Sequence, residues 1–123
     1  MAGKKILQLK TVYLIKEPMP TDSFKEFVLD QLSRLGQLEC RAMFGGHGLK
    51  LNGASFGIIF KGRLYFKTRK LTLPRYLAHG MKPFRPNAKQ TLKNYLEVPL
   101  EILEDAEQLS TWALEASQSS DKK

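Results

Sequence analysis

The chain has 123 residues, of which 42% are hydrophobic and 10% are aromatic. This length and composition predict one domain with a packed core and exclude an intrinsically disordered protein. The single cysteine, Cys40, excludes an intrachain disulfide and a cysteine-cluster metal site, and is typical of a reducing cytoplasm. No apolar run approaches the roughly 20 residues that span a bilayer, so we expect no membrane contact and a cytoplasmic location.

The net charge of +8 is distributed unevenly along the chain. Residues 41–96 contain twelve lysines and arginines and no acidic residue, whereas residues 97–123 sum to −5. Such a basic block projects a positive potential, which attracts phosphate groups or an acidic partner. The simpler alternative is a solvated basic surface that the acidic C-terminal helix balances. No residues that would read nucleic-acid bases are evident.

Residues 1–20 form an N-terminal extension for which two alternatives stay open. The apolar residues of the segment Leu7–Leu14 alternate in part with polar ones, as in an added strand. A disordered arm is the other alternative. We expect residues 1–18 to be dispensable for the fold, residues 21–117 to form the domain, and residues 118–123 to form a disordered tail.

A helix is predicted for Ser23–Leu35. Ser23 and Glu26 have the spacing of a capping box at its start, and Gly36 is placed to end it in a left-handed conformation. Five apolar residues recur at helical spacing and predict a face that packs on the core. These residues are Phe24, Phe27, Val28, Leu32 and Leu35.

The stretch 41–67 predicts three antiparallel strands joined by two tight turns. Asn52-Gly53 is the strongest two-residue hairpin signal, because both central residues take positive φ, and Lys61-Gly62 is a weaker one. The glycine-rich run Phe44–Gly48 precedes them as a turn or bulge. It matches neither a phosphate loop nor a dinucleotide fingerprint, so we favour a structural role over phosphate cradling.

The two turns also predict which residues share a face of the sheet, because directly paired residues lie on the same side. The first face is apolar enough to be a core, with Arg63 and Lys67 beside it. The opposite face has a notch where Gly48 and Gly57 oppose each other, and is open to a partner. The predicted core face carries Leu49, Leu51, Phe56, Ile58, Phe60 and Tyr65, and the opposite face carries Ile59, Leu64 and Phe66.

A short helix is predicted for Leu73–His79, with Pro74 in its first turn and Gly80 just past its end. The strand Met81–Phe84 is confined to a sheet edge by its proline. The strand Thr91–Val98 follows, with Leu92, Leu96 and Val98 on one side and Tyr95 on the other.

The C-terminal region predicts a helical turn at Leu100–Leu103 and a last helix that Asp105 caps, with Gln108 as the partner in a capping box. The buried stripe of that helix is Leu109, Trp112, Ala113 and Ala116. Together these elements predict an α+β fold, an antiparallel sheet of about five strands flanked by helices.

Two runs of residues resemble the N-terminal domain of the TfoX/Sxy family. Arg41–Leu49 reads RAMFGGHGL, and Arg63–Lys67 reads RLYFK. The later residues Tyr95, Val98-Pro99 and Trp112-Ala113 also fit the family, so the resemblance covers about residues 24–116. It implies the family's α+β fold and a bacterial protein linked to the regulation of natural competence. Full-length competence regulators carry a second, C-terminal domain, and we expect here a single-domain member.

Few residues of this chain suit catalysis. His47, His79 and Cys40 are the groups that titrate near neutrality, and the basic block contains no carboxylate for acid–base work or for a hard metal. A nucleophile pair of Cys40 and His47 is the least favoured alternative. We therefore expect no enzyme, no cofactor and no metal site.

The preferred hypothesis is a non-enzymatic regulatory or interaction module with a protein partner or a homodimer. The family resemblance implies a role around competence gene expression, beside the cyclic AMP receptor protein. The alternative is a nucleic-acid-binding protein that uses the basic block. Phe60, Arg63, Tyr65 and Lys67 share a face, as in sheets that stack bases, but the aliphatic residues predicted on that face require burial.

The same cationic and polar residues are the candidates for either kind of partner, DNA or RNA on the one hand and protein on the other. Three of them, Arg69, Lys70 and Arg75, crowd the start of the short helix and oppose its dipole. The full set is Arg41, His47, Lys50, Lys61, Arg63, Lys67, Arg69, Lys70, Arg75 and Lys82.

Overall fold

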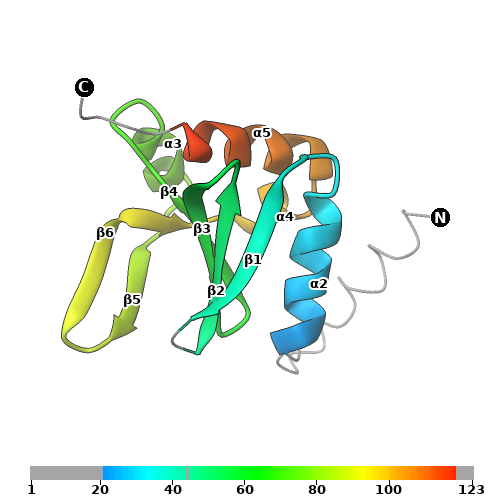
Figure 1. Cartoon of the computed structure of the whole chain (residues 1–123). Coiled ribbons are helices and arrows are strands. Elements are labelled where there is room, and N and C mark those ends of the chain that lie inside the picture. Colours follow the sequence, from blue (N-terminus) through cyan, green and yellow to red (C-terminus); the bar gives the residue numbers. More distant parts are fainter. Residues whose placement is uncertain (1–20, 44, 119–123) are drawn as a thin grey trace.

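The computed structural model describes residues 21–43 and 45–118, so the predictions for residues 1–20 and 119–123 lie outside the described residues. Within these ranges, an antiparallel six-stranded sheet packs against four helices (Figure 1). The predicted α+β fold is confirmed, and the sheet has six strands instead of about five, because Leu38–Met43 forms an additional first strand. The elements are α2 (Thr21–Gln31), β1 (Leu38–Met43), β2 (Gly46–Leu51), β3 (Ala54–Phe60), β4 (Arg63–Lys67), α3 (Leu73–Ala78), β5 (Pro83–Asn87), β6 (Gln90–Glu97), α4 (Leu100–Leu103) and α5 (Ala106–Ser117).

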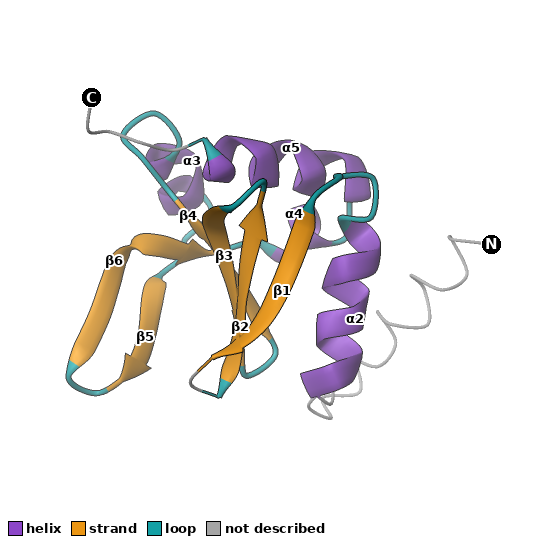
Figure 2. Ribbon diagram, in the orientation of Figure 1, coloured by secondary structure: helices purple, strands orange, loops and turns teal. Residues whose placement is uncertain are grey.

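The helices gather on one side of the sheet, with α2 alongside β1 and α5 across the strand ends (Figure 2). The main core lies between these helices and the sheet. The predicted helical stripes are confirmed, since Phe24 and Val28 of α2, and Leu32 directly after it, are fully buried. The stripe of α5 is buried in the same core, so one face of the sheet is covered.

The start and the end of the first helix differ from the prediction. The helix includes Thr21, so Ser23 lies inside it and does not form the expected cap. At its other end the chain unwinds through a turn in which the Leu35 amide donates to the Leu32 carbonyl. The left-handed residue is Gln37, with φ of 61°, rather than Gly36, because the change of direction falls one residue later, where the Gln37 carbonyl accepts from Asn52.

The sheet has the order β1-β2-β3-β4-β6-β5, and a bulge in β3 decides which residues face the helices. Leu49 pairs with Gly57, and Lys50 pairs with Ser55, which leaves Phe56 as an extra residue. A two-residue turn at Asn52-Gly53 without a bulge would pair Leu49 with Phe56 and Gly48 with Gly57, so the predicted notch of opposed glycines is wrong. Phe56 and Gly57 both lie on the helix side, which is sterically feasible because Gly57 has no side chain to compete with Leu49.

The bulge reverses the predicted faces of the residues that follow it in β3 and β4. Ile59, Leu64 and Phe66 join the main core, although the sequence predicted that they would be open to a partner. Ile58 and Tyr65 lie on the opposite face. The predicted second turn is confirmed, because Phe60 pairs with Arg63 and Ile58 with Tyr65, as a two-residue turn at Lys61-Gly62 requires.

The uncovered face carries a small second core. Ile58, Tyr65 and Phe84 are buried there, and Phe60 packs against them with its ring centroid 5.2 Å from that of Phe84. The β5–β6 hairpin bends away from β1–β3 on the side opposite α2 (Figure 1). Its bend breaks the predicted alternation in β6, since Leu92 and Tyr95 both pack on this cluster, whereas Leu96 joins the main core.

The two edges of the sheet differ in sequence. β5 is an edge strand, as its proline predicted, and two of its five residues, Pro83 and Pro86, lack a backbone N–H. β1 forms the other edge of the described sheet and contains no proline. Proline therefore blocks pairing with a further strand at the β5 edge, but not at the β1 edge.

The remaining helices follow the predictions closely. α3 has Pro74 in its first turn, and Gly80 follows it with φ of 76°. Pro99 precedes α4. At the start of α5, the Asp105 carboxylate accepts a hydrogen bond of 3.1 Å from the Gln108 amide and one of 2.9 Å from its side chain. The predicted cap by Asp105 is confirmed, but the reciprocal bond of a capping box is not formed, because the Asp105 amide donates to the Ile102 carbonyl.

Candidate functional site

A groove of about 290 Å³ opens on the uncovered face of the sheet, between β1–β3 and β6. Gly48 lies in it, directly between Arg41 of β1 and Ile58 of β3 in the sheet register. The Met43 side chain lies over Gly48, since a Cβ atom built there would approach the Met43 sulfur to 2.8 Å. The groove is lined by Arg41, Ala42, Met43, Gly48, Leu49, Lys50, Ser55, Gly57, Ile58, Leu92 and Tyr95.

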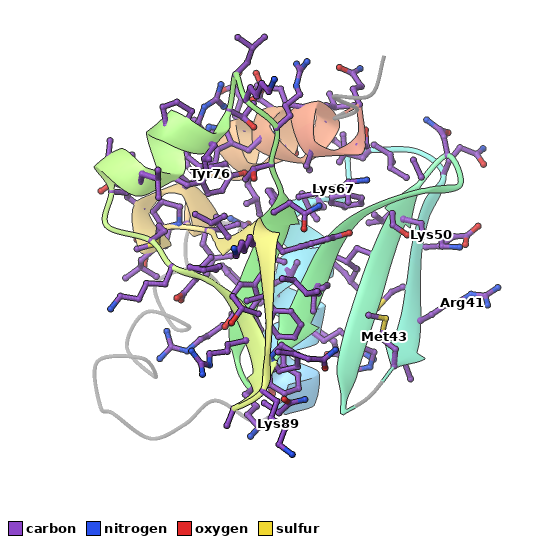
Figure 3. All side chains as sticks on the ribbon, turned by 90° about the vertical axis from the view of Figure 1, so that its left-hand side faces the viewer. Arg41, Met43, Lys50, Lys67, Tyr76 and Lys89 are labelled. Carbon is purple, nitrogen blue, oxygen red and sulfur yellow. The ribbon has the colours of Figure 1, made fainter. Side chains whose placement is uncertain are left out.

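The charged residues that line this groove are both positive. Arg41 and Lys50 line it, and Lys67 lies beside it, opposite Tyr95 in the register. Figure 3 shows Arg41 and Lys50 on the β1–β2 side of the molecule and Lys67 near its centre. Glu39 is paired with Lys50 across the strands, but none of the three cations forms an ion pair with a carboxylate of residues 21–43 and 45–118.

The other predicted candidates are not brought to the groove. Arg63 forms an ion pair of 2.9 Å with Glu97, and Arg75 is paired with Glu115 and lies 5.0 Å above the Trp112 ring. These two cations already have partners within the domain. The remaining candidates are separated: Lys61 is in the β3–β4 turn, Arg69 and Lys70 precede α3, Lys82 precedes β5, and His47 faces the helix side of β2.

Cys40 and His47 do not form a nucleophile pair. Cys40 pairs with Leu49, whereas His47 pairs with Ala42, so the two side chains are diagonal neighbours and no hydrogen bond links them. A nucleophile and its base need heavy atoms about 2.6–3.2 Å apart. Burial raises the pKa of the Cys40 thiol, and the charge of Lys25 lowers it less, so the neutral, unreactive form is favoured.

The third titratable group, His79, is engaged in structure. Its Nδ1 lies 2.9 Å from the Arg75 carbonyl oxygen, and its Nε2 lies 3.1 Å from a Glu101 carboxylate oxygen. These contacts join the end of α3 to α4. The described residues also contain no cluster of three or more histidine, cysteine or acidic side chains that could hold a metal ion.

Sequence reasoning missed the apolar wall of the groove, which Met43, Leu92 and Tyr95 form. Met43 belongs to the glycine-rich motif, but its orientation depends on the β1–β2 register. Tyr95 reaches the site only because β6 pairs with β4. Burial raises the pKa of the Tyr95 hydroxyl, so this wall is uncharged at neutral pH.

These observations define a small α+β domain with one helix-covered sheet face and one cationic, grooved face. Residues 30–120 match the family model of the TfoX N-terminal domain. The chain therefore belongs to the TfoX N-terminal domain family, as its RAMFGGHGL and RLYFK runs predicted. A comparison with curated proteins finds no match. Among the described helices, none is long and apolar enough to cross a membrane.

Proposed function

We propose that this domain is a non-enzymatic interaction module of a bacterial cytoplasm, and that it binds an acidic protein partner on the uncovered face of its sheet. Membership of the TfoX N-terminal domain family supports a regulatory role, and the family's link to competence makes competence gene expression the process to examine first. The partner would bind at the groove on this face.

One observation carries this proposal. Arg41, Lys50 and Lys67 lie on one face without a carboxylate partner among the described residues, whereas Arg63 and Arg75 are neutralised by Glu97 and Glu115. Unpaired like charges repel one another and do not stabilise the fold, so an external anionic partner accounts for them better than stability does. Complementary charge also accelerates encounter with such a partner.

The test is selection of binding peptides from a random displayed library. Wild-type protein is the bait, and a variant with Arg41, Lys50 and Lys67 changed to Ala is the counter-selection. The proposal expects enriched peptides that bind the wild type, lose binding to the variant, and bind less tightly at high salt. Absence of any enriched peptide, or equal binding to the triple variant, would contradict it.

A second copy of the chain is an alternative partner. Sedimentation velocity of the wild type and of the triple variant distinguishes the two cases. A dimer that dissociates when the three cations are removed would identify a homodimer as the complex made by this face. A monomer at all concentrations leaves a different protein as the partner.

Nucleic acid is the second candidate function, because the bulge places Phe60, Arg63, Tyr65 and Lys67 on the uncovered face. The Tyr65 ring, however, packs against Phe84 with centroids 4.8 Å apart, and both side chains are buried. Bases stack on exposed rings. Base stacking would therefore be limited to the partly exposed Phe60 ring, whereas phosphate contacts are readily accessible on this face.

Fluorescence anisotropy with single-stranded and double-stranded DNA and with RNA tests this candidate. Contacts from three cations predict a plot of log affinity against log salt with a slope of about −2 to −3. The triple Arg41, Lys50 and Lys67 variant should abolish such binding. Tight, salt-dependent binding that the triple variant loses would identify nucleic acid, and not a protein, as the ligand of this face.

A further inference from the structure

We propose that the groove takes one bulky apolar side chain of an acidic peptide segment, and that carboxylates flanking this side chain pair with Arg41 and Lys50. This inference rests on the proposed function and specifies the chemistry of the partner. The partner segment then has an apolar anchor with acidic neighbours. The groove selects the apolar side chain of the anchor, and Arg41 and Lys50 select acidic residues on either side of it.

The size and lining of the groove favour a single apolar side chain. Its volume of about 290 Å³ is at or below the lower end of sites that hold small molecules and cofactors, about 300–1,000 Å³. Met43, Ile58, Leu92 and Tyr95 provide apolar contacts. An aromatic or long aliphatic side chain fills such a space, and buried anchors of this kind dominate the binding energy of many interfaces.

The charge at the groove favours acidic neighbours for that anchor. Arg41 and Lys50 belong to the lining, which includes no carboxylate. Of the nearby acids on this face, Glu97 is held by Arg63, and Glu39 is opposite Lys50 without an ion pair. An arriving carboxylate therefore meets unneutralised cations beside an apolar surface, where electrostatic attraction is screened less than in bulk water.

Met43 makes the groove adaptable. Its side chain occupies the space above Gly48, and the unbranched thioether can change rotamer without moving the backbone. A Cβ atom at position 48 would clash with the Met43 sulfur and displace this side chain. Gly48→Ala therefore reduces the groove while leaving Arg41 and Lys50 unchanged, which separates the apolar contribution from the electrostatic one.

The probes are two fluorescein-labelled nine-residue peptides of Asp and Glu that differ only at the centre, where one has Phe and the other Ala. We expect wild-type protein to bind the Phe peptide at least about tenfold more tightly, as the loss of a buried anchor requires. Gly48→Ala should reduce binding of the Phe peptide by a similar factor and leave the Ala peptide unaffected. Arg41→Ala with Lys50→Ala should weaken both peptides.

Lys89→Ala is the matched control, since Lys89 lies in the β5–β6 turn outside the groove lining (Figure 3). It removes one positive charge and should leave both affinities within about twofold. Amide chemical shifts of the wild-type protein provide a readout that needs no variant. The Phe peptide should shift Gly48, Ile58 and Leu92 more than the Ala peptide does.

The outcomes separate this inference from the proposed function. Equal binding of the two peptides, with loss in the Arg41 and Lys50 variant, would overturn the anchor and keep the acidic partner. Binding of neither peptide, together with a library selection that succeeds on the same face, would overturn the inference alone. Failure of both experiments would overturn the proposed function as well.

Discussion

Gly46 occupies a position that allows no side chain. A Cβ atom there would lie 2.2 Å from the Ile59 carbonyl oxygen, which belongs to the backbone of the neighbouring strand and cannot rotate away. Gly46→Ala should therefore destabilise the protein by about 1–3 kcal/mol or more, as overpacking typically does. Urea denaturation measures the change in the free energy of unfolding.

Gly36→Ala is the control for this substitution, because no atom lies within 4 Å of a Cβ atom built at Gly36. The same chemical change should cost less than about 0.5 kcal/mol there, as most substitutions outside packed regions do. Equal effects at the two positions would show that the β2–β3 approach at Gly46 is not as close as described.

His79 makes the stability of the protein dependent on pH. The Arg75 carbonyl and then the Glu101 carboxylate raise the pKa of the imidazole above its ordinary value of 6.5. A raised pKa means that the folded state favours the protonated ring. The stabilisation is fully present below the unfolded pKa and is lost as the pH rises through the folded pKa.

The measurement compares the wild type with His79→Gln by urea denaturation at pH about 5.5 and about 8.5, which lie below and above the ordinary pKa of histidine. The difference in denaturation midpoint should be larger at the lower pH. Glu101→Gln should reduce this pH dependence, because it removes one cause of the raised pKa. A difference that is constant with pH would show that the His79 contacts do not depend on protonation.

At the scale of the secondary-structure element, the bulge in β3 assigns Phe56 and Phe60 to different faces. Phe56 is fully buried in the main core, whereas Phe60 is partly exposed on the small cluster of the uncovered face. Phe56→Ala should cost about 3–5 kcal/mol, and Phe60→Ala clearly less. Comparable losses measured by chemical denaturation would favour the simple hairpin without a bulge.

Most elements of this fold could be predicted from local signals. Helix periodicity, the Asp105 cap and the turn at Asn52-Gly53 each depend on a few neighbouring residues, and the structure confirms them. The bulge could not be predicted, because it depends on packing Phe56 beside Gly57 under the helices. A shift of one residue moves the side chains of a strand to the opposite face of the sheet. The missed bulge therefore placed Ile59, Leu64 and Phe66 on the wrong face in the prediction.

The same distinction applies to the site. Arg41, Lys50 and Lys67 were among the residues predicted from charge alone. The sequence could not distinguish these cations from Arg75, because the ion pair of Arg75 with Glu115 forms only when α3 packs against α5. Tyr95 could not be predicted as a neighbour of Lys67, because that contact depends on the long-range pairing of β4 with β6. Charge was readable in the sequence, and the apolar groove was not.

At the scale of the whole molecule, the cations of the uncovered face should be unimportant for folding. Changing Arg41, Lys50 and Lys67 together to Ala should alter the free energy of unfolding by no more than about 0.5 kcal/mol per site, with any gain largest at low salt, where self-repulsion is strongest. Thermal denaturation at two salt concentrations measures this.

Arg63→Ala provides the comparison, since it removes one cation that does have a partner. The Arg63 side chain is largely exposed in its ion pair with Glu97, so the loss should be at most about 1 kcal/mol. A triple variant that unfolds would show that the three cations have structural partners, and it would remove the main support for a binding face.

The two edges of the sheet limit how copies of this domain can assemble through their strands. Pro83 and Pro86 close the β5 edge to further pairing, which leaves β1 as the described edge where another strand can join. Two copies that paired through β1 would each use the one edge of the described sheet that proline does not block. Such an assembly ends at two, and sheet growth into a fibre has no second edge from which to continue.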